Sequence, residues 1–221
     1  MVDYQINSPC RSSKKCELIH KYCGALISKA GLGTLFDSLV DKIEGIDTTG
    51  YISYSELGIN NPTGYQYGPG GWWDLEMALG QKVSVNDIFI DFGSGKGRMV
   101  YLAARNYPFK KVIGVEITEK LNNIAKKNIE KNLRKLRCKN VQLVTSDVTN
   151  YVIPNDVTVV YVYDPFVPTV FVDLMKRLRT SLNLYPREMK IIYRNPVMHG
   201  WLIENGFTVA LKPDNNLSVY I

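Results

Sequence analysis

The second half of the chain alternates short apolar runs with longer segments whose apolar residues recur every three or four positions. Short apolar runs predict buried strands, and the three-to-four spacing predicts amphipathic helices. This alternation is typical of a mostly parallel sheet with helices on both faces, so we predict an α/β fold. The predicted strands are 88–92, 111–116, 141–146, 157–163 and 189–193, and the predicted helices are 96–106, 118–136, 168–182 and 197–205.

Two segments depart from this alternation. The third connection, "DVTNYVIPN" (147–155), is too short for a helical crossover, which usually needs about a dozen residues, so we predict an irregular link. The last 15 residues, "FTVALKPDNNLSVYI", form two apolar runs around a Pro-Asp-Asn-Asn turn and predict an antiparallel hairpin. The expected sheet therefore has seven strands, is mostly parallel, and ends in a hairpin that the dinucleotide fold lacks.

The first 71 residues have a different pattern. Residues 15–45 show helical spacing that Gly31 and Gly33 interrupt, residues 46–71 look irregular, and a further helix is expected at about 72–79. We predict an N-terminal helical extension and covering segment over 1–71 and an α/β domain over 72–221.

Composition narrows the class of protein. Hydrophobic residues make up 45% of the chain and charged residues 22%, values typical of soluble globular proteins. No apolar run approaches the roughly 20 residues that span a bilayer, and the N-terminus lacks a basic cluster followed by an apolar core. We therefore expect a cytoplasmic protein without a membrane partner.

The cysteines and the positive charge add little chemistry. Cys10, Cys16, Cys23 and Cys138 fit a reducing compartment, and without a paired C-x-x-C motif we predict no metal site, although Cys16, His20 and Cys23 would share a helix face. Much of the net charge of +6 lies in 119–140. Its spacing favours the solvated face of an amphipathic helix over a nucleic-acid surface.

The glycine-rich turn in "IFIDFGSGKGR" (88–98) predicts a nucleotide site. The spacing excludes a P-loop, and Arg98 stands where the third glycine of the dinucleotide fingerprint belongs. Asp91 lies at the carboxyl end of a strand, where open α/β sheets bind ligands. A carboxylate there repels a pyrophosphate and attracts an ammonium, so Asp91 favours S-adenosylmethionine, which carries an ammonium and a sulfonium, over NAD or ATP.

Three later strands each end in polar residues of the same kind of site. Glu116 ends the second strand and can bind both hydroxyls of a ribose, as in dinucleotide proteins. Asp147 ends the third strand and can accept a bond from an adenine amino group, although a simple turn aspartate is an equally good interpretation. The fourth strand ends in Asp164-Pro165-Phe166, which we expect near the reacting group, with Phe166 stacking on the substrate.

These motifs, "DFGSGKGR", Glu116, "SD" at 146–147 and "YDPF", resemble the Rossmann-like class I S-adenosylmethionine-dependent methyltransferases in their order. More narrowly, the chain is similar to a bacterial group that shares its DxGSGKGR loop with the Dot1-like and FAM173-like lysine methyltransferases. Two departures stand out: Gly70 replaces a usual Ser or Thr that bonds the cofactor carboxylate, and Asp164 replaces a more common Asn. The resemblance implies cofactor-binding roles for Asp91, Gly93, Ser94, Gly95, Gly97, Glu116, Ile117, Asp147, Val148 and Tyr67, the last closing over the cofactor.

The resemblance implies methyl transfer by in-line displacement, with S-adenosylhomocysteine as product. Asp164 and Tyr67 are the candidate catalytic residues, and Asp164, Pro165 and Phe166 the candidate substrate-binding residues. The first hypothesis for the acceptor is a small molecule with a reactive N or O. Alternatives are a protein lysine and a nucleic acid, the last disfavoured because the motif lacks the second proline of Asp/Asn-Pro-Pro-Tyr/Phe.

Overall fold

The computed structural model describes residues 33–59, 66–164 and 166–221. The chain divides into two compact units, Met1–Thr49 and Gly50–Ile221. The helical prediction for 15–32, the cysteines Cys10, Cys16 and Cys23, and Pro165 lie outside the described residues. The predicted division at 71/72 stays a prediction, and the units are described one at a time.

The described part of the first unit is the helix α2 (Gly33–Glu44) and the turn after it. The Asp41 carboxylate accepts bonds from the backbone N–H groups of Thr48 (2.5 Å) and Thr49 (2.7 Å). It also accepts bonds from the hydroxyls of both threonines. A single buried carboxylate therefore ties the turn back to the helix.

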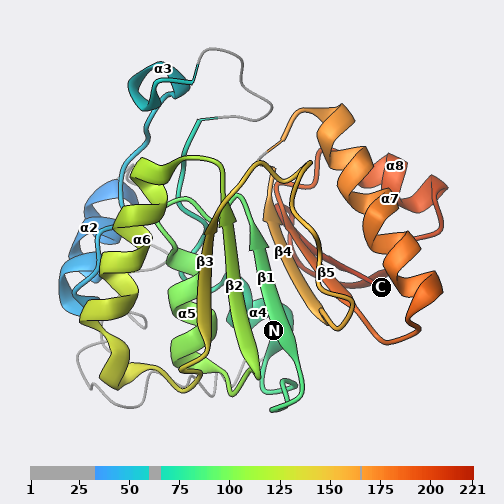
Figure 1. The fold of residues 1–221 in the computed structure, drawn as a ribbon, viewed down its shortest axis with the longest axis horizontal. Coiled ribbons are helices and arrows are strands. Elements are labelled where there is room, and N and C mark those ends of the chain that lie inside the picture. Colours follow the sequence, from blue (N-terminus) through green and yellow to red (C-terminus); the bar gives the residue numbers. More distant parts are fainter. Residues whose placement is uncertain (1–32, 60–65, 165) are drawn as a thin grey trace, which may run out of the picture. The chain divides into compact units, whose positions relative to one another are not determined.

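The second unit contains one seven-stranded sheet (Figure 1). Its order is β3-β2-β1-β4-β5-β7-β6, with β1 to β5 parallel and β7 antiparallel to β5 and β6. The mixed sheet and its terminal hairpin confirm the fold expected from the sequence. The strands are β1 (Ile88–Phe92), β2 (Lys111–Glu116), β3 (Val141–Thr145), β4 (Val159–Tyr163), β5 (Lys190–Arg194), β6 (Val209–Asp214) and β7 (Leu217–Tyr220).

Helices cover both faces of this sheet (Figure 1). On one face lie α4 (Asp74–Leu79), α5 (Arg98–Asn106) and α6 (Glu119–Lys131), and on the other lie α7 (Pro168–Leu184) and α8 (His199–Glu204). None of the helices in the described ranges has the length and apolar character to cross a membrane.

Strand alternation decides which side chains reach which face. From β1, Ile88, Ile90 and Phe92 enter the core cluster that includes Leu174 and Leu178 of α7. Phe89 and Asp91, the alternate residues, therefore point to the face covered by α4 and α5. The central strand β1 thus places the Asp91 side chain near its C-terminal end, on the face covered by α4 and α5.

The connection between β3 and β4 contains no helix, as its length predicts. Arg177 of α7 holds this link, because its guanidinium donates to the carbonyl oxygens of Val148 (2.7 Å) and Tyr151. The irregular link therefore rests on the helix that follows it.

Helix ends differ from the prediction where local chemistry competes with the helix. The helix predicted from residue 96 begins at Arg98, because Gly97 has φ +82°. The helix predicted to reach 136 stops at Lys131 and continues as a 3₁₀ turn, Leu133–Lys135. The Asn132 side chain donates to the Asn128 carbonyl at 2.9 Å, which competes with helical bonding there.

A short helix, α3 (Tyr54–Leu57), lies in the region predicted to be irregular. Ser53 and Glu56 form a capping box: Glu56 Oε2 accepts from Ser53 N at 2.8 Å, and Glu56 N donates to Ser53 Oγ at 3.4 Å. The Ser-x-x-Glu spacing was the sequence signal for this helix.

Replacing Gly97 with alanine should destabilise the fold. A Cβ at this position would lie 2.8 Å from Ala125 Cβ, and φ is +82°. Overpacking plus a left-handed backbone predicts a loss of about 1–3 kcal/mol in the free energy of unfolding, measured by urea denaturation.

The matched control is Gly200→Ala in α8, where no atom lies within 4 Å of the new Cβ. This variant should be neutral or stabilised by up to about 1 kcal/mol, because alanine has the higher helix propensity. Equal effects of the two substitutions would contradict the packing argument.

Candidate functional site

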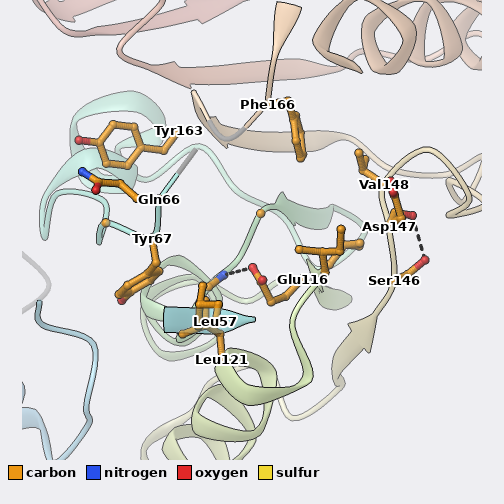
Figure 2. Close-up of a pocket in the computed structure, with 15 residues that line it drawn as sticks. Leu57, Gln66, Tyr67, Glu116, Leu121, Ser146, Asp147, Val148, Tyr163 and Phe166 are labelled. Carbon is orange, nitrogen blue, oxygen red and sulfur yellow. Dashed lines mark hydrogen bonds between the residues drawn. The ribbon is translucent and has the colours of Figure 1, made fainter. Parts of the chain in front are cut away.

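A recess lies at the carboxyl edge of the sheet, where the loops after β1, β2, β3 and β4 meet (Figure 2). We call it the main recess; its empty volume is about 690 Å³, part of it open to solvent. A smaller inner recess, which shares Tyr67, Gly68, Gly93 and Tyr163 with it, adjoins the glycine loop. The predicted site residues that line one or both are Tyr67, Asp91, Gly93, Ser94, Gly95, Glu116, Ile117, Asp147, Val148 and Phe166.

Gly97 and Asp164 do not line either recess. Gly97 instead precedes α5 and permits close packing on α6, while Asp164 lies at the end of β4. Pro165 lies outside the described residues. The structure therefore brings together most of the predicted cofactor residues, whereas the predicted substrate residues are divided.

The glycine loop turns tightly against β2. The N–H groups of Gly93 and Ser94 both donate to the Val115 carbonyl, at 2.9 and 3.0 Å. Gly95 has φ +54°, and a Cβ there would lie 2.4 Å from Cε2 of Tyr67. The Tyr67 backbone pairs with Ile52 in an isolated antiparallel bridge, which fixes the tyrosine ring over the loop. Only glycine allows this approach.

Glu116 is more constrained than the sequence suggests. Its Oε2 accepts from Gly95 N at 2.8 Å, a bond drawn in Figure 2. Its Oε1 accepts from Thr118 N (2.9 Å) and Thr118 Oγ1 (2.8 Å). A carboxylate offers about four acceptor sites, so one remains, on Oε2. As it stands, Glu116 can bind one ribose hydroxyl; binding both requires one of these bonds to open.

Asp147 has the turn role weighed from the sequence. Its Oδ1 accepts from Thr149 N and Thr149 Oγ1, both at 2.8 Å, which is a turn interaction. No described residue donates to Oδ2 of this side chain, and Asp147 lines the main recess. The turn therefore orients the carboxylate and leaves Oδ2 without a donor among the described residues, and the bond to an adenine amino group stays a prediction.

The Ser94 side chain faces the sheet. Its Oγ lies 2.9 Å from where a Cβ on Gly114 would sit, and it is buried without a hydrogen-bond partner among the described residues. Ser94 therefore presents main-chain atoms to the inner recess, and we expect its contribution to ligand binding to come from the backbone.

Asp91 is the electrostatic centre of the inner recess. Burial raises the pKa of its carboxyl group well above the usual range, and the Glu116 carboxylate raises it further. Within the described residues no donor bonds the Asp91 side chain. A buried carboxylate of this kind is costly unless a cation or donor joins it, so the site fits a ligand that carries an ammonium.

The segment above the inner recess is anchored by an aspartate that the sequence did not single out. Oδ2 of Asp74, at the start of α4, accepts from Gly71 N (2.9 Å) and from the Tyr161 hydroxyl (2.7 Å). Arg194 lies 3.4 Å from Oδ1 and also donates to Asp214 at 3.1 Å. This network joins residues 87 positions apart in the sequence, so no local pattern signals it.

Gly70 has a packing role that the resemblance did not reveal. A Cβ there would lie 2.6 Å from the Tyr161 hydroxyl and 3.1 Å from Met99 Cε. The Gly70 carbonyl accepts a bond from Arg98 Nη1 at 2.9 Å. Glycine at this position therefore follows from how closely the covering segment approaches the sheet.

Asp164 and Asn195 form a pair at the ends of β4 and β5. Both have left-handed backbones, with φ of 37° and 54°, which Asp and Asn tolerate better than other side chains. Asn195 Nδ2 donates to Asp164 Oδ2 at 3.0 Å. Burial raises the pKa of Asp164, and the Asn195 bond opposes that rise. Left-handed non-glycine residues cluster at functional sites, and Asn195 was missed by the sequence analysis.

Comparison with family models and curated proteins gives two matches. Residues 75–159 match the family described as "Histone methylation protein DOT1". A protein-lysine N-methyltransferase of Saccharolobus islandicus (strain REY15A) is 47% identical over 58 residues, which are 26% of this chain and 34% of that protein. The matched region therefore spans about a third of the relative's length.

Solved structures share the fold. An RNA methyltransferase from Salinibacter ruber, in complex with S-adenosyl-L-homocysteine, superposes with a TM-score of 0.52 at 24% identity, covering 70% of this chain and 91% of that one. A precorrin 8w decarboxylase from Methanobacterium thermoautotrophicum gives 0.50 at 18% identity, covering 73% and 94%. At these identities the likeness establishes the fold.

In the absence of ligand, the Asp91→Asn variant should become more stable relative to the wild type as the pH rises. The folded pKa of Asp91 is raised above the unfolded value of about 3.9, so the native state binds the proton more tightly. Between these two pKa values the wild type loses stability with rising pH, by about 1.4 kcal/mol per unit of pKa difference, and the variant lacks this slope.

Urea denaturation of both proteins from pH 3.5 to 8 measures the difference. The two curves should converge near the acid end of this range and separate above it. A difference that does not change with pH would show that Asp91 is not held at a raised pKa.

Proposed function

We propose that this chain, which belongs to the class I S-adenosylmethionine-dependent methyltransferases, transfers the methyl group of S-adenosylmethionine to the side-chain amine of a protein lysine. The assignment of the cofactor rests on Asp91. Its carboxylate is buried, has no donor in the described structure and lines a recess next to the glycine loop. The match to the DOT1 family and the lysine-modifying archaeal relative support the acceptor.

The residues present fit this cofactor. Asp91 would hold the ammonium, the glycine loop would approach through its backbone, Glu116 would bind a ribose hydroxyl, and Asp147 would accept from the adenine amino group. When bound, S-adenosylmethionine supplies a methyl group activated by a sulfonium. The chain's task is then to align an acceptor and exclude water.

The proposed acceptor end has aromatic rings in its lining, and a carboxyl group follows one of them in the sequence. Tyr67, Tyr163 and Phe166 line the main recess (Figure 2). Aromatic faces attract a cationic amine and its methylated products. Asp164, fixed by Asn195, stands next to this lining in sequence and would accept a hydrogen bond from the amine and orient it. The amine must be neutral to react, and the raised pKa of Asp164 makes it a better proton acceptor than an exposed aspartate.

The sequence alone favoured a small-molecule acceptor, and that remains the competing hypothesis. The hypothesis of an RNA acceptor is supported only by the similarity of the fold to that of a solved RNA methyltransferase. We place lysine first because the family matched over 75–159 is described as histone methylation, because the curated relative is a protein-lysine N-methyltransferase, and because the aromatic lining suits an amine.

Binding of S-adenosylhomocysteine should raise the melting temperature. At 100 times its dissociation constant a ligand adds about 2.7 kcal/mol, or roughly 5–10 °C for a chain of this size. NAD should give no shift, because its pyrophosphate meets Asp91. Asp91→Ala should abolish the shift, whereas the exposed control Glu130→Ala should retain it. A shift with NAD alone would overturn the cofactor assignment.

Asp164→Ala should lower kcat for methyl transfer by about 10²-fold or more, because the amine loses its orienting acceptor. Asp164→Asn should retain more activity, because the amide oxygen still accepts a hydrogen bond. Affinity for S-adenosylhomocysteine should not change in either variant, which isothermal calorimetry checks.

Labelled methyl groups identify the acceptor class. The protein is incubated with methyl-labelled S-adenosylmethionine and with separated protein, RNA and small-molecule fractions of a cell extract, and labelled protein is examined by mass spectrometry. Methylated lysine is expected, and label in the RNA or small-molecule fraction instead would overturn the lysine assignment while leaving the cofactor assignment intact.

A further inference from the structure

Positive charge is concentrated in one stretch of the chain. Residues 120–139 contain eight lysines and arginines and one acid, Glu130, which gives this stretch a net charge of +7 at pH 7, whereas the whole chain carries +6. The rest of the chain is therefore close to neutral. A charge imbalance confined to one segment is typical of a surface that meets an anionic partner.

The fold places most of these cations on one exposed surface. α6 buries its apolar side, including Leu121, Ala125 and Ile129, against β2, β3 and α5. The cations fall on the solvent side of this helix and on the turn that follows it. We call these exposed residues the basic surface: Lys126, Lys127, Lys131, Arg134, Arg137 and Lys139.

The charges of the basic surface are not neutralised within the part of the chain that the structure describes. None of its six cations forms an ion pair with a described carboxylate. Arg137 donates to the Asn106 carbonyl at 2.8 Å and Lys139 to the Leu133 carbonyl, bonds that position these side chains and leave their charge in place. A solvated helix face normally intersperses charges of both signs, so this surplus favours a partner with several negative charges.

The basic surface lies away from the main recess. α6 starts after β2, at the carboxyl edge of the sheet, and returns to the opposite edge, because β2 and β3 are parallel (Figure 1). Directly after the basic surface, the Asn140 carbonyl accepts from Val112 N at 3.0 Å, near the start of β2. The cofactor therefore does not account for these charges, and a partner bound to them leaves the recess open.

The composition of the basic surface selects among anionic partners. Segment 120–139 has no Phe, Tyr or Trp, whereas protein interfaces are enriched in aromatic residues and single-stranded nucleic acids stack on them. Leu133, 47% exposed, is the one exposed large apolar residue of this segment, so the surface lacks the apolar face that inserts amphipathic helices into bilayers. Charge without aromatic or apolar anchors matches the phosphate backbone of a duplex.

We infer that the basic surface binds the phosphate backbone of a double-stranded nucleic acid without reading its base sequence. This inference goes beyond the proposed function and does not depend on it. Lys127 and Lys131 lie four residues apart on one side of α6, with a rise of about 6 Å between them, and Arg134 continues the row in the turn. A duplex held by this row would keep the protein on nucleic acid while the recess acts on its acceptor.

Fluorescence anisotropy of the full chain with short labelled duplexes of random sequence, one of DNA and one of RNA, tests the inference. Salt is varied from about 50 to 200 mM, because each phosphate contact releases counterions. The logarithm of the wild-type association constant should fall linearly with the logarithm of the salt concentration, with a slope of about −4 to −5 for about five phosphate contacts. Tighter binding to one duplex identifies the source of the backbone.

A matched pair of double variants separates the basic surface from net charge. Lys127→Gln with Lys131→Gln should weaken duplex binding about tenfold or more at about 50 mM salt and make the slope less steep by about 2. The control, Lys176→Gln with Lys212→Gln, removes two exposed lysines of α7 and β6 and should change the affinity by less than about threefold. Both variants should keep the wild-type urea midpoint, because all four lysines are exposed.

A wild type that binds neither duplex at about 50 mM salt, or equal losses in the two double variants, would overturn the inference. So would tighter binding to single strands, to vesicles of anionic lipid or to polyglutamate than to either duplex, because each of these results assigns the surface to another class of partner. S-adenosylhomocysteine is titrated in parallel. Failure of this ligand to bind, with duplex binding as expected, would count against the proposed function and leave the present inference standing.

Discussion

The burial of one carboxylate at the end of the central strand is the constraint on which the site depends. Strand alternation sends Asp91 to the face of α4 and α5, away from the apolar cluster beneath α7. There burial and the Glu116 carboxylate both raise the pKa of Asp91 and so disfavour its charged form. Ligand-free protein carries this cost, and a cationic ligand removes it. Pairing the Asp91 carboxylate with a cationic group of the ligand therefore contributes to the free energy of binding.

The covering segment is fastened next to that carboxylate by the sheet itself. Tyr161 is the register partner of Asp91 in the β1–β4 pair, and its hydroxyl donates to Asp74. A shift of one residue in this register would turn Tyr161 to the opposite face and release the segment. Arg194 offsets the burial that raises the pKa of Asp74, so the anchor remains charged more readily than burial alone would allow. The position of the Asp91 carboxylate and the anchoring of the covering segment by Asp74 thus both depend on the pairing of β1 with β4.

The sequence predicted the features that depend on local order. Apolar periodicity located the strands and most helices, the length of 147–155 predicted a link without a helix, and the glycine spacing predicted the loop. It did not predict contacts between distant residues: Tyr161 with Asp74, Arg98 with Gly70, and Asn195 with Asp164. It also did not predict the bonds that Glu116 accepts from Gly95 and Thr118, because the folded loop sets them.

The distribution of charge separates the two ends of the proposed site. At the inner end, the buried Asp91 carboxylate suits a ligand that carries an ammonium. At the outer end, Phe166 lines the main recess, Tyr163 lines both recesses, and Asp164 is the acidic neighbour of Tyr163 in the sequence. Methyl transfer to an amine moves a positive charge from sulfur to nitrogen, toward this outer end. In the proposed reaction, aromatic faces and one carboxylate would stabilise the charge on the nitrogen. This suits an amine acceptor better than a hydroxyl, since a hydroxyl acceptor loses its proton and leaves no cation behind.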